Sequence, residues 1–87
     1  MAARLLKLLA NERRLLILCR LIEEGEMNVT QLAEAVDLAQ SALSQHLAKM
    51  REDGLVTFRR ESQTIWYRIS DPRAARILQT LHELFVG

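Results

Sequence analysis

Apolar residues recur at helical spacing along most of this chain, with strict alternation in one stretch of its second half. The first short segment, Ala3 to Leu9, predicts a helix. Asn11 is suited to cap a second helix, which should end before Gly25, a natural C-terminal stop. The second segment is apolar on nearly every side of a helix, so we expect it to be buried. Its apolar residues are Leu15, Leu16, Ile17, Leu18, Cys19, Leu21 and Ile22.

Two shorter helical patterns follow, joined by a tight turn. Asn28 with Gln31 three residues later resembles a capping box, and the helix that it opens should run to about Val36. Residues 37–39 form the turn, and the next helix covers Gln40 to about Glu52 with its leucines inward. Two short helices with a three-residue joint predict a helix-turn-helix over about residues 28–53. Four polar side chains share the outer face of its second helix: Ser41, Ser44, Gln45 and Lys49.

The alternating stretch predicts a β-hairpin, followed by a last helix. Leu55 to Arg60 and Thr64 to Ile69 are the expected strands of a wing over about residues 55–70, with residues 61–63 at its tip. Asp71 should cap the last helix, with Pro72 at its first position. This helix carries an apolar stripe of Ala74, Ile77, Leu78, Leu81 and Leu84 or Phe85. The expected fold is therefore mainly α with a two-stranded β-hairpin (α+β), in the order ααααββα.

Composition indicates one small globular domain, residues 1–87, with 49% hydrophobic residues and a net charge of +1. A core of this size is marginal alone, and oligomerisation is a common remedy. The charges are segregated into a basic N-terminal fifth, an acidic middle and a basic helix-hairpin section. The single cysteine excludes an intrachain disulfide. No signal peptide or membrane span is visible, so we expect a cytoplasmic protein without a membrane partner.

A helix with a polar outer face, backed by a basic hairpin, is the shape of a major-groove reader with a wing. Gln can bond adenine with two hydrogen bonds, while Ser is short and accepts either base. We expect Gln40, Ser44 and Gln45 to touch base edges, and Ser41 or Lys49 to touch phosphate. The alternative is that several of these side chains are only solvated helix surface.

The expected wing adds two basic and two polar side chains near its tip, Arg59, Arg60, Gln63 and Thr64. They would place the wing on the DNA backbone or in the minor groove, unless they are simply solvated hairpin residues. His46 lies beside the apolar face of the preceding helix, where a packed histidine and a phosphate contact are both open.

The chain resembles the ArsR/SmtB family of bacterial winged-helix repressors over essentially its whole length. The resemblance is carried by LLKLLANERRLLILCRL (Leu5 to Leu21), QSALSQHLAKMREDGLV (Gln40 to Val56) and RRESQTIWYRI (Arg59 to Ile69). The NxxRL opening, the SxxSQHL recognition helix and the RRxxQT wing are similar to the branch that contains BigR, HlyU and NolR. Two positions depart from relatives: Ala39 replaces a common capping Ser, and Ser62 replaces a Gly or Ala at the wing tip.

The resemblance implies a homodimer, built from the first and last helices, that binds a palindromic operator in double-stranded DNA. Pairing the last helix across a two-fold axis would also bury its apolar stripe, and such an axis matches an inverted repeat. The dimerisation helices are expected at about residues 3–10 and 71–86. The expected interface residues are Leu5, Leu8, Ile77, Leu78, Leu81 and Phe85.

Metal sensing, which the resemblance raises, is not expected here, and neither is any other cofactor. The helix from Val29 to Val36 has no Cys or His, so the thiolate site of arsenic and cadmium sensors is missing. The zinc site of relatives pairs an Asp and a His two residues later with a His and a Glu of the partner subunit. Here Asp71 matches the first ligand, but Arg73 stands at the second position, and Leu84 and Gly87 stand at the positions of the partner ligands. We therefore expect His82 to be an interface or surface residue.

Cys19 is the redox candidate, because it matches the first of two cysteines in BigR-like proteins. Val86 occupies the second position, so a dithiol switch within one subunit is not possible. Cys19 alone could still be oxidised or persulfidated, or it could be inert packing in an apolar helix. A constitutive NolR-like repressor is the alternative to a redox-responsive or sulfide-responsive one.

Two other function classes complete the comparison. A winged-helix module that binds another protein instead of DNA stays an alternative that the small net charge permits, although the polar recognition face and the basic wing argue against it. An enzyme is not expected, because the sequence has no Gly-rich phosphate loop or ligand cluster and no base near Cys19 in the sequence.

Overall fold

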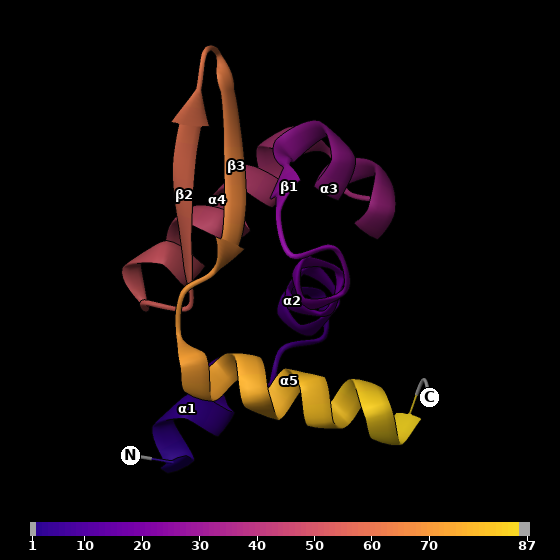
Figure 1. The fold of residues 1–87 in the computed structure, drawn as a ribbon, viewed down its shortest axis with the longest axis vertical. Coiled ribbons are helices and arrows are strands. Elements are labelled where there is room, and N and C mark those ends of the chain that lie inside the picture. The colour runs from indigo at the N-terminus through magenta and orange to yellow at the C-terminus, as the bar shows by residue number, and fades with distance from the viewer. Residues whose placement is uncertain (1, 86–87) are drawn as a thin grey trace.

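Five helices and three strands make up the residues described by the computed structural model, 2–85 (Figure 1). In chain order they are α1 (Ala2–Leu9), α2 (Glu12–Glu24), β1 (Met27–Asn28), α3 (Val29–Val36), α4 (Gln40–Glu52), β2 (Val56–Glu61), β3 (Thr64–Ile69) and α5 (Pro72–Phe85). The predicted winged helix-turn-helix is confirmed, with every expected helix and both expected strands present.

The starts of α2 and α3 are set by the capping residues that the sequence indicates. The Asn11 side chain accepts a hydrogen bond of 3.1 Å from the Arg14 N–H. The Asn28 side chain accepts one of 2.8 Å from the Gln31 N–H, and the Asn28 N–H donates in return to the Gln31 side chain at 3.2 Å. This reciprocal pair is the predicted capping box. Gly25 ends α2 with a φ of 81°, a conformation that glycine adopts without strain.

The predicted two-stranded hairpin is confirmed, and the sheet has a third strand that the sequence analysis did not predict. The strand order is β1-β3-β2, and both pairings are antiparallel. The two residues of β1 pair Met27 with Tyr67 and Asn28 with Trp66. A strand of two residues shows no alternation of polar and apolar side chains, and only its pairing with β3 identifies it as a strand. It matters for function because it joins the wing directly to the start of α3.

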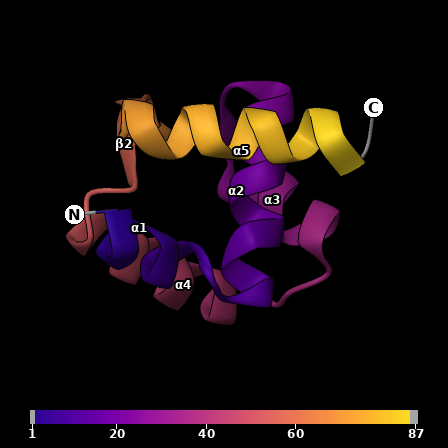
Figure 2. The same cartoon turned by 90° about the horizontal axis from the view of Figure 1, so that it is seen from below.

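The hairpin and α5 lie at opposite ends of the molecule. In Figure 1 the hairpin of β2 and β3 projects at the top, while α5 lies across the bottom and α2 occupies the middle. Figure 2, seen from below, shows α5 crossing α2. Asp71 accepts a hydrogen bond of 2.9 Å from the Arg73 N–H, so it caps α5 as predicted. The polar helix-turn-helix and the apolar last helix are thus on separate parts of the surface.

One apolar core is built from all five helices together with β1 and β2. It includes Leu5 and Leu78, which are only 7% and 0% exposed. The structure therefore places these two expected interface residues inside the protomer, because α5 packs against α2 through this side. The expectation that α2 is buried was wrong at Leu16, which is 42% exposed, and only partly correct at Leu15, Cys19 and Ile22, which are half-buried.

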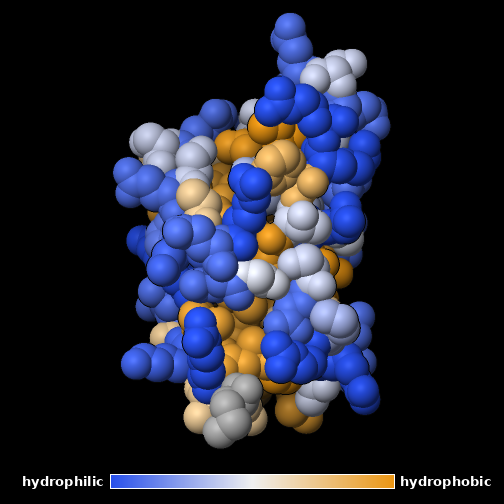
Figure 3. All heavy atoms as spheres, turned by 90° about the vertical axis from the view of Figure 1, so that its left-hand side faces the viewer, coloured by the Kyte–Doolittle hydropathy of each residue, from blue (hydrophilic) through white to orange (hydrophobic). Residues whose placement is uncertain are grey.

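The exposed large apolar side chains of the described residues lie only on α1, α2 and α5. They are Leu6 at 55%, Leu16 at 42%, Leu84 at 70% and Phe85 at 81% exposure. Figure 3 shows apolar side chains at the end of the molecule opposite the hairpin tip, with others visible between polar ones along the same face. Within residues 2–85 no helix combines the length and the apolarity needed to cross a membrane.

Candidate nucleic-acid interface

The outer face of α4 is polar and open to solvent. Leu43, Leu47 and Met50 turn inward and are fully buried, so the 3.6-residue period directs the intervening side chains outward. The side chains that the structure leaves exposed there are Gln40, Ser41, Ser44, Gln45 and Lys49. His46, beside them, is half-buried. The sequence-based prediction of one polar face on this helix is therefore correct in its geometry.

The start of α4 has no side-chain cap, as the departure at Ala39 indicates. Ala39 has the extended conformation of an N-cap residue, with φ −63° and ψ 147°, but makes no side-chain hydrogen bond to the helix. The first N–H groups of a helix without such a cap are available to solvent or to an anion. They lie beside Gln40 and Ser41, at the end of the helix that would meet DNA.

The wing exposes its two tip arginines on opposite faces of the sheet. Arg60 pairs with Ile65 and Arg59 pairs with Trp66, and directly paired residues share a face. Glu61 belongs to β2 and pairs with Thr64, so the tip is the two-residue loop Ser62–Gln63 and not the three residues predicted. Ser62 has a φ of 56°. Glycine adopts this conformation without strain, so a Gly at this position would suit the turn better than Ser.

Arg59, which the sequence analysis expects at the DNA backbone or minor groove, is engaged within the protein. Its Nε and Nη2 donate to the two carboxylate oxygens of Glu26, both at 2.8 Å, and its Nη1 donates to Glu61 at 2.7 Å. The guanidinium also lies 5.8 Å from the centre of the Trp66 ring. The hydrogen bond from Arg59 is the main reason why the pKa of the Glu26 carboxyl is lowered. Arg59 is therefore a weaker candidate for a phosphate contact than Arg60.

Two more basic residues of α4, Lys49 and Arg51, contact other side chains of the protein. Lys49 lies 3.8 Å from Asp53, which also faces Arg14 at 3.6 Å. The Lys49 side chain stays 61% exposed, so this loose contact leaves it accessible. Arg51 lies over the Phe58 ring at 4.4 Å from its centre and joins α4 to β2. Sequence reasoning missed this role of Arg51, because no local pattern pairs a helix residue with a strand residue.

A groove of about 260 Å³, lined by polar and apolar side chains, separates the wing tip from the start of α3. Gln63 and Thr64 line it on the wing side, and Thr30 is the exposed residue on the α3 side. The structure thus brings the predicted wing residues close to the first helix of the helix-turn-helix. Thr30 was not among the predicted contacts, although the first helix of such motifs crosses the DNA backbone and a hydroxyl at its start is a signal for a phosphate contact.

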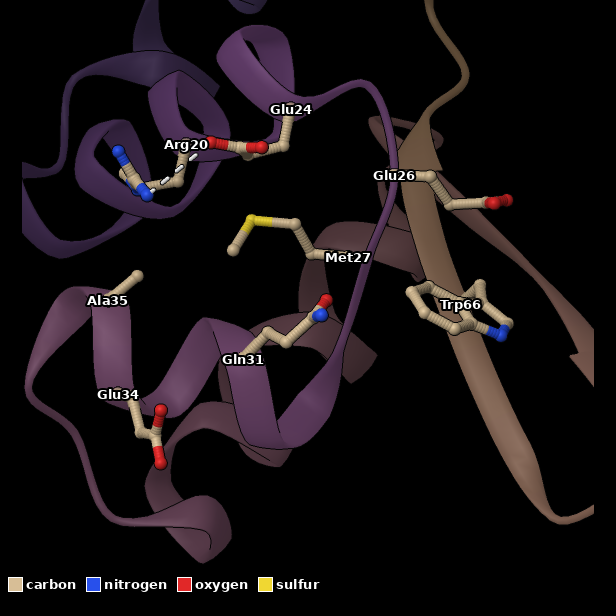
Figure 4. Close-up of a pocket in the computed structure, with 8 residues that line it drawn as sticks. All are labelled: Arg20, Glu24, Glu26, Met27, Gln31, Glu34, Ala35 and Trp66. Carbon is tan, nitrogen blue, oxygen red and sulfur yellow. Dashed lines mark ion pairs between the residues drawn. The ribbon is translucent and has the colours of Figure 1, made fainter.

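A second hollow of about 480 Å³ lies against the side of Trp66 (Figure 4). Met27 and Gln31 point into it, and Glu24, which pairs with Arg20 at 3.7 Å, lies at its edge. Its carboxylates come from Glu24, Glu26 and Glu34. Arg20 also lines this hollow, and Glu24 and Glu26 each pair with an arginine, so its lining carries charges of both signs.

Cys19 lines an apolar groove of about 570 Å³ between α2 and α5. Burial, and secondarily the charge of Glu23, raise the pKa of the Cys19 thiol. His82 faces Glu23 across this groove at 3.8 Å. No three His, Cys, Asp or Glu side chains within residues 2–85 gather as metal ligands would. Val86 and Gly87, at two positions used in the sequence comparison, lie outside the described residues.

The comparisons with known proteins place the chain among bacterial regulators. Residues 11–57 match the bacterial regulatory protein, arsR family. The chain is 49% identical to the transcriptional activator HlyU of Vibrio cholerae over 93% of this chain and 74% of that protein. It is 49% identical to the nodulation protein NolR of Rhizobium meliloti over 97% of this chain and 68% of that protein.

A solved structure of a repressor shows the same fold. The transcriptional repressor BigR from Xylella fastidiosa superposes with a TM-score of 0.86 at 37% sequence identity. The match covers 99% of this chain and 87% of that structure. The likeness includes the hairpin and the last helix, beyond the segment that the family match covers.

Proposed function

Because the chain belongs to the ArsR family of bacterial DNA-binding transcriptional regulators, we propose that it is a homodimeric repressor that binds an inverted-repeat operator. The observation that carries the proposal is the polar outer face of α4, with an uncapped helix start and a basic wing in the same half of the molecule. Such a face can enter a major groove while the wing follows the backbone.

In this proposal the recognition helix reads bases through a few side chains near its start. Gln40 and Gln45 can each bond an adenine through the amide, and Ser44 is short enough to accept either base. Ser41 and Lys49 are exposed on the same helix, and one or both would meet phosphate. His46, half-buried beside them, would either pack or reach the backbone.

The wing and the start of α3 would supply the remaining backbone contacts. Arg60 forms no ion pair with the residues that the structure describes, so its charge is available to a phosphate. Gln63, Thr64 and Thr30 border the groove between the wing and α3, where their polar groups can bond to the same strand. Phosphate contacts set the register of the protein, while the bases are read by α4.

The second copy would cover the apolar end of the molecule. Leu84 and Phe85 on α5 and Leu6 on α1 are exposed apolar residues, and the half-buried Leu8 and Leu81 are on the same helices. Joining two protomers through these helices would place two recognition helices symmetrically, as a palindromic site requires. A cytoplasmic location follows from binding to the bacterial chromosome.

The test is a fluorescence-anisotropy titration with DNA from upstream of the gene, a scrambled duplex and a series of salt concentrations. The wild-type protein should bind the first duplex selectively and more weakly as salt rises, because phosphate binding releases counterions. Gln45→Ala should lose about 1–3 kcal/mol of discrimination. Gln79→Ala, an exposed glutamine on α5, is the matched control and should bind normally. Equal affinity of Gln45→Ala and wild type would remove α4 from the reading face.

A further inference from the structure

The two adjacent arginines of the wing, Arg59 and Arg60, have different roles. This inference rests on the proposed function. We propose that Arg59 is a positioning residue, which ties the outer strand of the wing to the segment that enters the helix-turn-helix, while Arg60 meets the DNA. Three donor groups of one guanidinium are used on two carboxylates, and the Glu26 contact spans 33 positions of the chain. A side chain held in this way is fixed by the protein before DNA arrives.

The strand register explains how Arg59 reaches Glu26. β3 is the middle strand, and its Trp66 pairs with Arg59 on one side and with Asn28 on the other. Paired residues share a face, and so do residues two apart along an extended chain, which places Glu26 on the face of Asn28. The Arg59 side chain therefore crosses over Trp66 to reach Glu26. The ion pair joins β2 to the residue just before β1, across the middle strand.

This bridge strengthens a weak part of the sheet. β1 contributes only two residue pairs to its contact with β3. Asn28, the second of these residues, also caps α3. A change in the angle of the wing would therefore be transmitted to the start of α3, and the bridge from Arg59 to Glu26 resists such a change. Arg51 is stacked on Phe58 at the opposite face of the hairpin. It joins the wing to α4 and so also resists a change in the angle of the wing.

Electrostatics disfavour the alternative, a phosphate contact by Arg59. A phosphate that approached this guanidinium would also meet Glu26 and Glu61, whose two negative charges outweigh the one positive charge. It would have to replace charge-assisted hydrogen bonds of 2.7 and 2.8 Å that are already formed. Arg60 lies on the other face of the hairpin and carries no such cost.

Two substitutions separate the two roles in the operator titration. Arg59→Lys keeps the charge that a phosphate needs but loses the planar fork that binds the Glu26 carboxylate. Glu26→Gln removes the negative charge of this partner and leaves Arg59 paired with Glu61 alone. If Arg59 positions the wing, both variants weaken operator binding, by about two- to five-fold for an exposed ion pair, and neither changes the dependence on salt. Arg60→Gln is the control, and its log–log salt slope should become shallower by about 0.9 for each phosphate that the variant no longer binds.

The fluorescence of the free protein provides a second readout that does not depend on DNA. Trp66 is the only tryptophan of the chain, and Arg59 lies over its ring. Arg59→Lys and Glu26→Gln should therefore increase the quenching of Trp66 by acrylamide, while Arg60→Gln should leave it unchanged. The inference is overturned if Arg59→Lys binds and quenches like the wild type, or if Glu26→Gln binds more tightly with a steeper salt slope. If the wild-type protein binds no operator, the repressor proposal fails, and the quenching still tests the bridge.

Discussion

Phe85 offers the sharpest test of how two copies of this chain associate. It lies at the end of α5 and is 81% exposed in the protomer, more than the other exposed large apolar residues that the structure describes. Full burial of a phenylalanine is worth about 1.5–3 kcal/mol relative to exposure. Four-fifths of that gain, counted once in each subunit, gives about 2.4–5 kcal/mol for the dimer. Phe85→Ala should thus raise the dimer dissociation constant by roughly two to three orders of magnitude, since 1.4 kcal/mol is tenfold.

Sedimentation equilibrium over a range of protein concentrations measures this constant directly. Circular dichroism should show that Phe85→Ala keeps its helices, because an exposed side chain contributes little to the protomer core. Gln79→Ala, also exposed on α5, is the matched control and should dimerise normally. Leu78→Ala supplies the contrast: Leu78 is fully buried, so its truncation should cost the fold about 2–5 kcal/mol.

Two results would refute this reasoning. A Phe85→Ala protein that sediments as a dimer with the wild-type constant would show that the end of α5 lies outside the interface. A Phe85→Ala protein that loses its helices on becoming a monomer would show that the protomer depends on the dimer for its fold, against the folded monomer expected here. The expected pattern is intact helices with weakened association.

Three further predictions concern stability and the thiol. Asn28→Ala should lower the free energy of unfolding in urea by about 1 kcal/mol, and Asn28→Ser should restore most of it, because Ser can also cap α3. The pKa of Asp71 is lowered, mainly by the side chain of Arg73, so its stabilising effect should be complete above the ordinary aspartate pKa of about 3.9 and disappear as the pH falls below it. Urea unfolding at several pH values should show this acid loss in the wild type and a smaller one in Asp71→Asn. Because the pKa of Cys19 is raised, alkylation by iodoacetamide at neutral pH should be slower than for glutathione, and polysulfide should leave operator binding unchanged.

The features predicted well from sequence are those that short segments determine. Asn11 and the Asn28–Gln31 pair bond to atoms three residues away, so their effect is visible in the local pattern. The polar face of α4 follows from helical period alone. For the same reason the family resemblance could identify a winged helix-turn-helix without knowledge of any long-range contact.

The features that were missed depend on residues far apart in the chain. β1 exists because Met27 and Asn28 meet Tyr67 and Trp66, and no two-residue segment reveals such a partner. The inward position of Leu78 depends on which side of the α5 stripe meets α2, and periodicity alone does not decide between protomer core and interface. Interface predictions drawn from an apolar stripe therefore need the packing of the protomer first.

The different roles of Arg59 and Arg60 have a measurable consequence for the whole complex. Counting Lys49, Arg59 and Arg60 in both subunits would give about six bound phosphates and a log–log salt slope of about −5.4. Without Arg59, whose charge is already shared with Glu26 and Glu61, about four phosphates remain and the slope is about −3.6. The weaker salt dependence would leave more of the operator affinity to the base contacts of α4. A measured slope near the steeper value would return Arg59 to the residues that bind phosphate.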